Sequence, residues 1–242
     1  MKLYHIDIEP GEISENVVLM ESPQQCKMIA DNLENPELLA SKREYVAYNG
    51  EYKGKRMSIT SVGLGGPAAS IALEELISAG AKKLIYIGTI ESVKENINCG
   101  ELVIPTAAVR GDGTSLEYVL EEFPAISSRV MYEGLINASK NSNRKIHSGI
   151  ACTHDALRLN SRLANTLSNG IWKETNVLGI EGVVSTLFVI AYLRGVKLGA
   201  LLGVTASSHT EKTITEKQEI EALFKEMSEI SFEALLYEGE EK

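Results

Sequence analysis

The residues best suited to hold a charged ligand form one glycine-rich turn, Gly63-Leu64-Gly65-Gly66-Pro67. A largely β-branched run, 59–62, precedes the turn and an apolar helical pattern follows it, which predicts a strand, a turn and a helix. Glycine permits positive φ and close approach of the backbone, and the first turn of a helix offers unpaired N–H groups to an anion. A tight turn without a ligand would need the same glycines, so both interpretations stay open.

Strands and helices alternate around this turn and must position it. Strands are predicted at 16–20, 44–52, 55–62, 83–87, 101–104, 107–110, 146–153, 176–178 and 197–205, and helices at 24–32, 68–78, 131–141, 182–194 and 215–237. Ser22 and Pro23 are typical of a helix N-cap and first turn. We expect Gly88-Thr89 to end the strand at 83–87, residues 111–115 to form a loop and 118–128 to be irregular.

This alternation predicts a largely parallel or mixed sheet with helices on both faces. No linker rich in proline or serine divides the chain, so we expect a single α/β domain over residues 1–242.

Composition narrows the class of protein. The net charge of -9 argues against nucleic acid or an anionic membrane as a partner, because either would need a basic face. The three cysteines, Cys26, Cys99 and Cys152, have no metal-ligand spacing and indicate reduced thiols in a cytoplasmic protein. No metal site is expected. The N-terminus has no apolar signal segment, and no apolar stretch is long enough to cross a bilayer.

Several short motifs occur together in a characteristic order: 39–45 (LASKREY), 63–70 (GLGGPAAS), 87–89 (IGT), 109–115 (VRGDGTS), 122–125 (EFPA) and 180–182 (IEG). Together they resemble the nucleoside phosphorylase family, and within it the uridine phosphorylase branch, from about His5 to the final helix. The resemblance implies a three-layer α/β/α sandwich with a distorted mixed sheet, assembled as dimers or as a hexamer built from three dimers. It also implies cleavage of the N-glycosidic bond of a nucleoside, with phosphate as co-substrate and no cofactor.

The resemblance assigns three residues to the ribose. Glu181 matches the glutamate that accepts hydrogen bonds from the 2′- and 3′-hydroxyls and favours positive charge on the sugar. Ile180 takes the position beneath the sugar, and His5 matches a histidine that a neighbouring subunit lends to the 5′-hydroxyl. The alternative for Glu181 is a carboxylate that simply complements the dipole of the following helix.

Three further residues are assigned to phosphate. Arg43 matches an arginine lent across the dimer, Thr89 matches a hydroxyl donor, and Gly65 belongs to the turn beside them. Glu44 resembles a carboxylate that holds a monovalent cation in relatives. Because Ala68 replaces the serine that accompanies it, an ion-pair role at an interface is the alternative.

Four positions depart from the family pattern at the phosphate site. Gln25 and Tyr86 stand where two arginines are expected, and Glu21 and Glu91 each stand where a glycine is expected. Each charge in a partly buried site contributes on the order of a few kcal/mol, so these changes predict much weaker phosphate binding. The alternative is that Glu21 and Glu91 point to solvent.

The base side is altered as well. Residues 153–160 lack a clear equivalent of the base-reading segment, and the group that assists the leaving base falls at Ser207 or Ser208. His209 could act as general acid, and His154 beside Asp155 is a second candidate. An exposed loop histidine is the alternative for each.

Three functions follow from these observations. The first is an atypical nucleoside phosphorylase of the uridine phosphorylase type. The second is a phosphate-independent nucleosidase in which Glu21 or Glu91 activates water. The third is a nucleoside-binding relative without catalysis. Fold alone does not separate them, because function depends on the site.

Overall fold

The computed structural model describes residues 1–156, 171–210 and 212–239. Its strands are β1 (Asn16–Met20), β2 (Glu34–Lys42), β3 (Tyr45–Tyr52), β4 (Lys55–Ser61), β5 (Lys83–Ser92), β6 (Leu102–Gly111), β7 (Ala125–Ile126), β8 (Ile146–His154), β9 (Val177–Glu181), β10 (Lys197–Ser207) and β11 (Lys212–Thr213). Its helices are α1 (Pro23–Ala30), α2 (Gly65–Ala79), α3 (Thr114–Tyr118), α4 (Arg129–Ala138), the 3₁₀ turn η1 (Ser139–Asn141), α6 (Ile171–Glu174), α7 (Val184–Arg194) and α8 (Lys217–Leu235).

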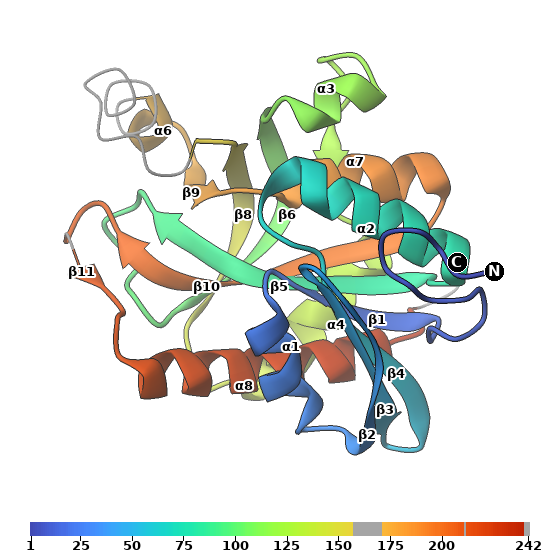
Figure 1. The fold of residues 1–242 in the computed structure, drawn as a ribbon. Helices are drawn as coiled ribbons and strands as arrows, with labels where there is room; N and C mark the ends of the chain where they lie inside the picture. Colours follow the sequence, from blue (N-terminus) through green and yellow to red (C-terminus); the bar gives the residue numbers. More distant parts are fainter. Residues whose placement is uncertain (157–170, 211, 240–242) are drawn as a thin grey trace.

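One mixed sheet joins these strands in the order β11-β10-β6-β8-β9-β5-β1-β4-β3-β2, and β7 pairs with β6 off this path (Figure 1). The strands β4, β1, β5 and β10 run parallel to one another, and β3 and β9 are antiparallel to their neighbours β4 and β5. Because β10 also pairs with β5, the strands β5, β9, β8, β6 and β10 close into a ring. The expected distorted mixed sheet is confirmed, and the ring was not predicted.

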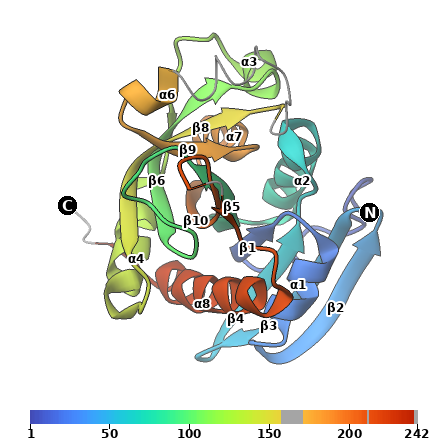
Figure 2. The same cartoon turned by 90° about the vertical axis from the view of Figure 1, so that its left-hand side faces the viewer.

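Helices cover the sheet on two sides. Figure 2 shows α8 running beneath the strands while α2 and α7 lie on the opposite side. Two buried apolar clusters correspond to these layers, one against α2 and α7 and the other against α1, α4 and α8. The α/β/α arrangement predicted from the family resemblance is therefore present. None of the helices in the described part of the chain combines the length and apolar character needed to cross a bilayer.

Local sequence explains several element boundaries. Ser22 caps α1 and Pro23 occupies its first turn, as predicted. Lys53 and Gly54, both at positive φ, form the two-residue turn between β3 and β4, which suits a hairpin. Gly80 ends α2 with φ +120°, where a residue with a Cβ would be strained.

Four expectations about the elements were wrong. β2 was missed because its side chains are mostly exposed and polar, so neither apolar alternation nor an apolar run marks it. β5 continues past Gly88-Thr89 to Ser92 because β10 and β9 pair with that extension. The two strands expected at 101–110 are one strand, β6, with a register shift after Pro105. The segments expected to lack regular structure contain α3 and β7.

Candidate active site

The candidate site lies where three strands end and three helices begin. The parallel strands β1 and β4 lead into α1 and α2, and β9 leads into α7. In open α/β sheets, ligands bind at such carboxyl ends. At the start of α2, Gly63 and Gly65 have φ +78° and +79°, no side chain caps the helix at Leu64, and the first turn holds no acidic residue. The predicted strand, glycine turn and helix are all present, and this turn leaves backbone N–H groups available.

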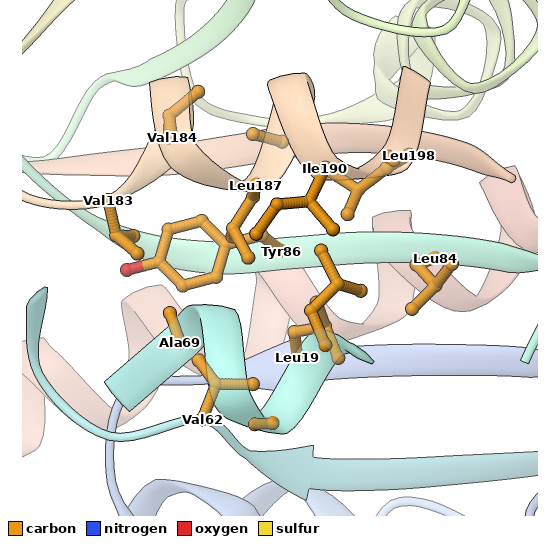
Figure 3. Packing of buried hydrophobic residues seen from close by; sticks show 14 of the residues in the cluster. Leu19, Val62, Ala69, Leu84, Tyr86, Val183, Val184, Leu187, Ile190 and Leu198 are labelled. Atoms are coloured by element: carbon orange, nitrogen blue, oxygen red, sulfur yellow. The ribbon is translucent and has the colours of Figure 1, made fainter. Parts of the chain in front are cut away.

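Two carboxyl groups, of Glu21 and Glu181, and the phenol of Tyr86 form an acidic cluster at this edge. Glu21 directly follows the end of β1. The hydroxyl of Tyr86, on β5, donates a hydrogen bond to Glu21 Oε1 at 2.8 Å. Burial raises the pKa of Glu21, and the hydrogen bond from Tyr86 acts the other way. Burial, then the charges of Glu21 and Glu181, hold the pKa of Tyr86 well above its usual range. Figure 3 shows the Tyr86 ring among Val62, Ala69, Val183, Val184 and Leu187.

Glu181 ends β9 and is only 2% exposed. Its Oε2 accepts from the backbone N–H groups of Val183 at 2.6 Å and Val184 at 2.9 Å, and its Oε1 accepts from Thr153 Oγ1. Burial raises the pKa of Glu181 to about 7, against these hydrogen bonds, and the charge of Glu21 adds to the rise. The carboxyl group thus complements the start of α7, which was the alternative interpretation from sequence, and its ribose role stays a prediction.

A second buried carboxylate, Asp112, was missed by the sequence interpretation. Its oxygens accept from Ser115 N at 2.7 Å, Ser115 Oγ at 2.9 Å, Thr186 Oγ1 at 2.8 Å and Ser185 Oγ. Burial alone would raise the pKa of Asp112, but these hydrogen bonds outweigh it and hold the pKa below its usual value. The spacing of Asp112 and Ser115 could have indicated this role, because an aspartate often accepts a hydrogen bond from the backbone N–H three residues later at the start of a helix. Asp112 ties α3 to the start of α7, where the backbone N–H groups of Val183 and Val184 donate to Glu181.

Arg110 organises the segment beside Asp112. Its guanidinium donates to Ser115 Oγ and to the backbone carbonyls of residues 115, 119, 120, 121 and 123. The charge is thus satisfied within the fold, so Arg110 is not an available phosphate ligand.

Within the described residues, Arg43 and His5 make no hydrogen bond or ion pair with the acidic cluster. Arg43 is exposed in the turn between β2 and β3 at φ +55°, and its side chain makes no hydrogen bond or ion pair with the described residues. His5 contacts α2, where its Nδ1 lies 2.7 Å from Glu75 Oε1 and its backbone N–H donates to the same carboxylate. Both were expected to serve a neighbouring subunit, and that role stays a prediction.

The remaining phosphate positions take distinct local roles. Gln25 completes a capping box with Ser22: Gln25 N donates to Ser22 Oγ at 3.4 Å, and Ser22 N donates to Gln25 Oε1 at 3.2 Å. Glu91 is exposed, which was the solvent alternative, whereas Glu21 faces Tyr86. Thr89 is partly exposed on β5 opposite Gly203 of β10.

Candidate base-site residues lie at the carboxyl end of β10 and in the residues that follow it. Ser207 is buried and Ser208 donates to the carbonyl of Ser92 at 3.2 Å. His209 is exposed, with Nδ1 3.6 Å from Glu95 Oε1. On β8, His154 Nδ1 accepts from Ala156 N at 3.1 Å.

Other expectations concern β9, the cation position and the base-reading segment. Ile180 is half-buried and pairs with Glu91 across β9 and β5. Glu44 lies beside the glycine turn, where a Cβ on Gly63 would come 3.1 Å from Glu44 Cγ and 2.8 Å from Ala68 Cβ. Residues 157–160 of the expected base-reading segment lie outside the described residues.

We expect Glu181→Gln to make stability less dependent on pH. Because the native pKa of Glu181 is about 7 against an ordinary 4.5, the native state holds its proton longer than the unfolded state. The free energy of unfolding should therefore fall as pH rises from about 4.5 to 7. From pH 5 to pH 8, the free energy of unfolding of the variant should therefore rise relative to that of wild type by on the order of 2 kcal/mol. Urea unfolding of both proteins at both pH values measures this difference. An equal change in the free energy of unfolding of wild type and variant would contradict the prediction.

The comparisons with known proteins agree with this architecture. A sequence model of the Phosphorylase superfamily matches residues 16–236. A uridine phosphorylase from Thermococcus kodakarensis is 32% identical over 219 residues, covering 86% of this chain and 79% of that protein. A guanosine phosphorylase from Halorubrum lacusprofundi is 31% identical, covering 83% and 81%. The crystal structure of a uridine phosphorylase from Vibrio fischeri superposes with a TM-score of 0.88 at 28% identity, covering 97% and 95%.

The chain therefore belongs to the phosphorylase superfamily. The resemblance to the nucleoside phosphorylases of the uridine phosphorylase type, first recognised in its short motifs, is confirmed over most of the sequence.

Proposed function

We propose that this protein cleaves the N-glycosidic bond of a nucleoside with phosphate, releasing a free base and a pentose 1-phosphate. The observation that carries this proposal is the match of most of the chain to proteins named uridine phosphorylase and guanosine phosphorylase. In this reaction a phosphate oxygen bonds to C1′ while the bond to the base breaks, and the base keeps the electron pair and takes up a proton. Phosphate is the co-substrate, and no cofactor takes part.

The residues available for this chemistry surround the carboxyl ends of the strands. Glu181, while ionised, would stabilise positive charge on the sugar in an oxocarbenium-like transition state. The uncapped start of α2 at Gly65 would favour the phosphate. Arg43 and His5 would complete a site on another subunit, so a homodimer or a hexamer of three dimers is part of the proposal. A cytoplasmic location is also part of it.

Hydrolysis is a second candidate, favoured by the hydrogen bond between Tyr86 and Glu21. Tyr86 stands where the family resemblance expects an arginine, and its hydroxyl holds the carboxyl group of Glu21, which stands where a glycine is expected. A carboxylate there can take a proton from attacking water. A nucleoside-binding protein without catalysis is the third function considered, and no observation favours it.

Release of free base tests these functions. Uridine, thymidine, inosine, adenosine and methylthioadenosine would each be incubated with and without phosphate. Phosphorolysis predicts release that requires phosphate and falls at least tenfold in Glu181→Gln, whereas Glu15→Gln, which removes an exposed carboxylate at the other end of β1, should not change it. Equal release without phosphate would instead establish hydrolysis. Binding of a nucleoside without release from any substrate would overturn both catalytic proposals.

A further inference from the structure

The hydrogen-bonded pair of Tyr86 and Glu21 has a fixed position in the fold. β1 and β5 are parallel, with Leu19 opposite Tyr86, so the tyrosine hydroxyl reaches forward to the residue that follows β1. Tyr86 is 1% exposed, and its ring is enclosed by Val62, directly after β4, by Ala69 of α2 and by side chains at the start of α7 (Figure 3).

The backbone on both sides of the pair is also constrained. Gly88 leaves the space that the Tyr86 ring occupies, because a Cβ there would lie 2.6 Å from ring carbons. After Glu21, the capping box of Ser22 and Gln25 fixes the entry into α1. Glu21 itself is only partly exposed, and its second oxygen, Oε2, accepts no hydrogen bond from the described residues. One carboxylate oxygen is thus held and the other is available to a ligand.

The charge around the pair is negative. The charge of Glu21 acts on Glu181, and the charges of both carboxyl groups act on Tyr86. Within the described residues, the hydrogen bonds and ion pairs bring no lysine, arginine or histidine to either carboxyl group. The uncapped start of α2 favours an anion, and Figure 3 shows Ala69 of α2 beside the Tyr86 ring. A phosphate dianion is therefore attracted by the start of α2 and repelled by the carboxylates. A neutral water molecule is subject to neither effect.

We propose that Glu21, held in place by Tyr86, sets the acceptor specificity of this site by disfavouring phosphate relative to water. The inference rests on the proposed cleavage of a nucleoside. It deepens that function by assigning the choice between phosphate and water to one side chain. Like-charge repulsion at short range in a partly buried site is strong enough to change affinity by an order of magnitude or more.

Glu21→Gln tests the proposal because it removes the charge and keeps the shape. We expect the KM for phosphate to fall at least tenfold, with the KM for the nucleoside changed less than twofold. If wild type releases base without phosphate, the variant should gain phosphate-dependent release. Glu15→Gln is the matched control, since it removes a carboxylate from the opposite end of β1, and its KM for phosphate should equal that of wild type. An unchanged KM for phosphate in Glu21→Gln would overturn the proposal.

Tyr86→Phe provides a second variant in case Glu21→Gln fails to fold. Losing the hydroxyl removes a hydrogen bond that favours the charged form of Glu21, so the KM for phosphate should again fall. A KM for phosphate that stays constant or rises in Tyr86→Phe would contradict the proposal.

A direct binding measurement separates this inference from the proposed function. Titration of inorganic phosphate, followed by ³¹P NMR line broadening, requires no turnover. If no nucleoside is cleaved, the proposed function fails, yet at least tenfold tighter phosphate binding by Glu21→Gln than by wild type would still support the role of Glu21. Equal binding by the two proteins would overturn it.

Discussion

Replacement of Asp112 by alanine is expected to lower the free energy of unfolding by about 3 to 5 kcal/mol. The carboxylate is 2% exposed and accepts from the side chains of Ser115, Ser185 and Thr186 and from the backbone N–H of Ser115. Alanine would leave these donors buried without an acceptor. Because α3 and α7 meet through Asp112, the loss should act on the whole domain, and urea unfolding at pH 7 measures it.

Asp112→Asn is the graded comparison. The amide oxygen can still accept from Ser115 N and Thr186 Oγ1, and the two serine hydroxyls can turn to accept from the amide nitrogen. We therefore expect less than half of the loss seen with alanine. Because the pKa of Asp112 lies below its usual value, its carboxylate stabilises the fold above about pH 4 and loses this effect as pH falls further. Equal stability of Asp112→Ala and wild type at pH 7 would show that these hydrogen bonds contribute nothing net.

The glycine turn shows what sequence alone could establish. A β-branched run, three glycines and an apolar helical pattern occur within 18 residues, so the strand, turn and helix were predictable from local information. The order of the short motifs along the chain then predicted the fold through the family resemblance. Three of these motifs, 63–70, 109–115 and 180–182, lie where a strand leads into a helix.

The acidic cluster was beyond the same reasoning. Glu21 and Tyr86 are 65 residues apart, and their contact follows from the register of β1 against β5, which periodicity does not give. The sequence could say only that both positions depart from the family pattern. It also left open whether Glu21 and Glu91 point to solvent, and the structure places Glu91 outward and Glu21 against Tyr86.

Gln25 was interpreted only as the loss of an arginine. The spacing Ser22-x-x-Gln25 is a capping-box signature, so its structural role was readable from the sequence once Ser22 was identified as an N-cap. A position that binds a ligand in relatives can thus hold a residue with a local structural role instead. A comparison with family motifs alone does not reveal that role.

Gly88→Ala is expected to cost about 2 to 6 kcal/mol of stability, because a Cβ at this position would clash with the Tyr86 ring. A Cβ on Gly88 would lie 2.5 Å from Tyr86 Oη and 2.6 Å from Cε1 and Cζ. The ring is fully buried and Figure 3 shows it enclosed, so it cannot turn away freely. Overpacking costs about 1 to 3 kcal/mol, and loss of the hydrogen bond to the partly buried Glu21 adds about 1 to 3 kcal/mol.

A double-mutant cycle identifies the ring as the cause. In a Tyr86→Leu background the ring atoms Cε1, Cζ and Oη are absent, so adding the alanine methyl at position 88 should cost less than about 1 kcal/mol. Gly113→Ala is the matched control, since a Cβ there would come no closer than 3.5 Å to Asp155 Oδ2. Thermal and urea unfolding of the four proteins in the cycle give the coupling energy. If Gly88→Ala costs the same in both backgrounds, the Tyr86 ring is not what requires glycine at this position, and the fixed geometry of the Tyr86–Glu21 pair would need another origin.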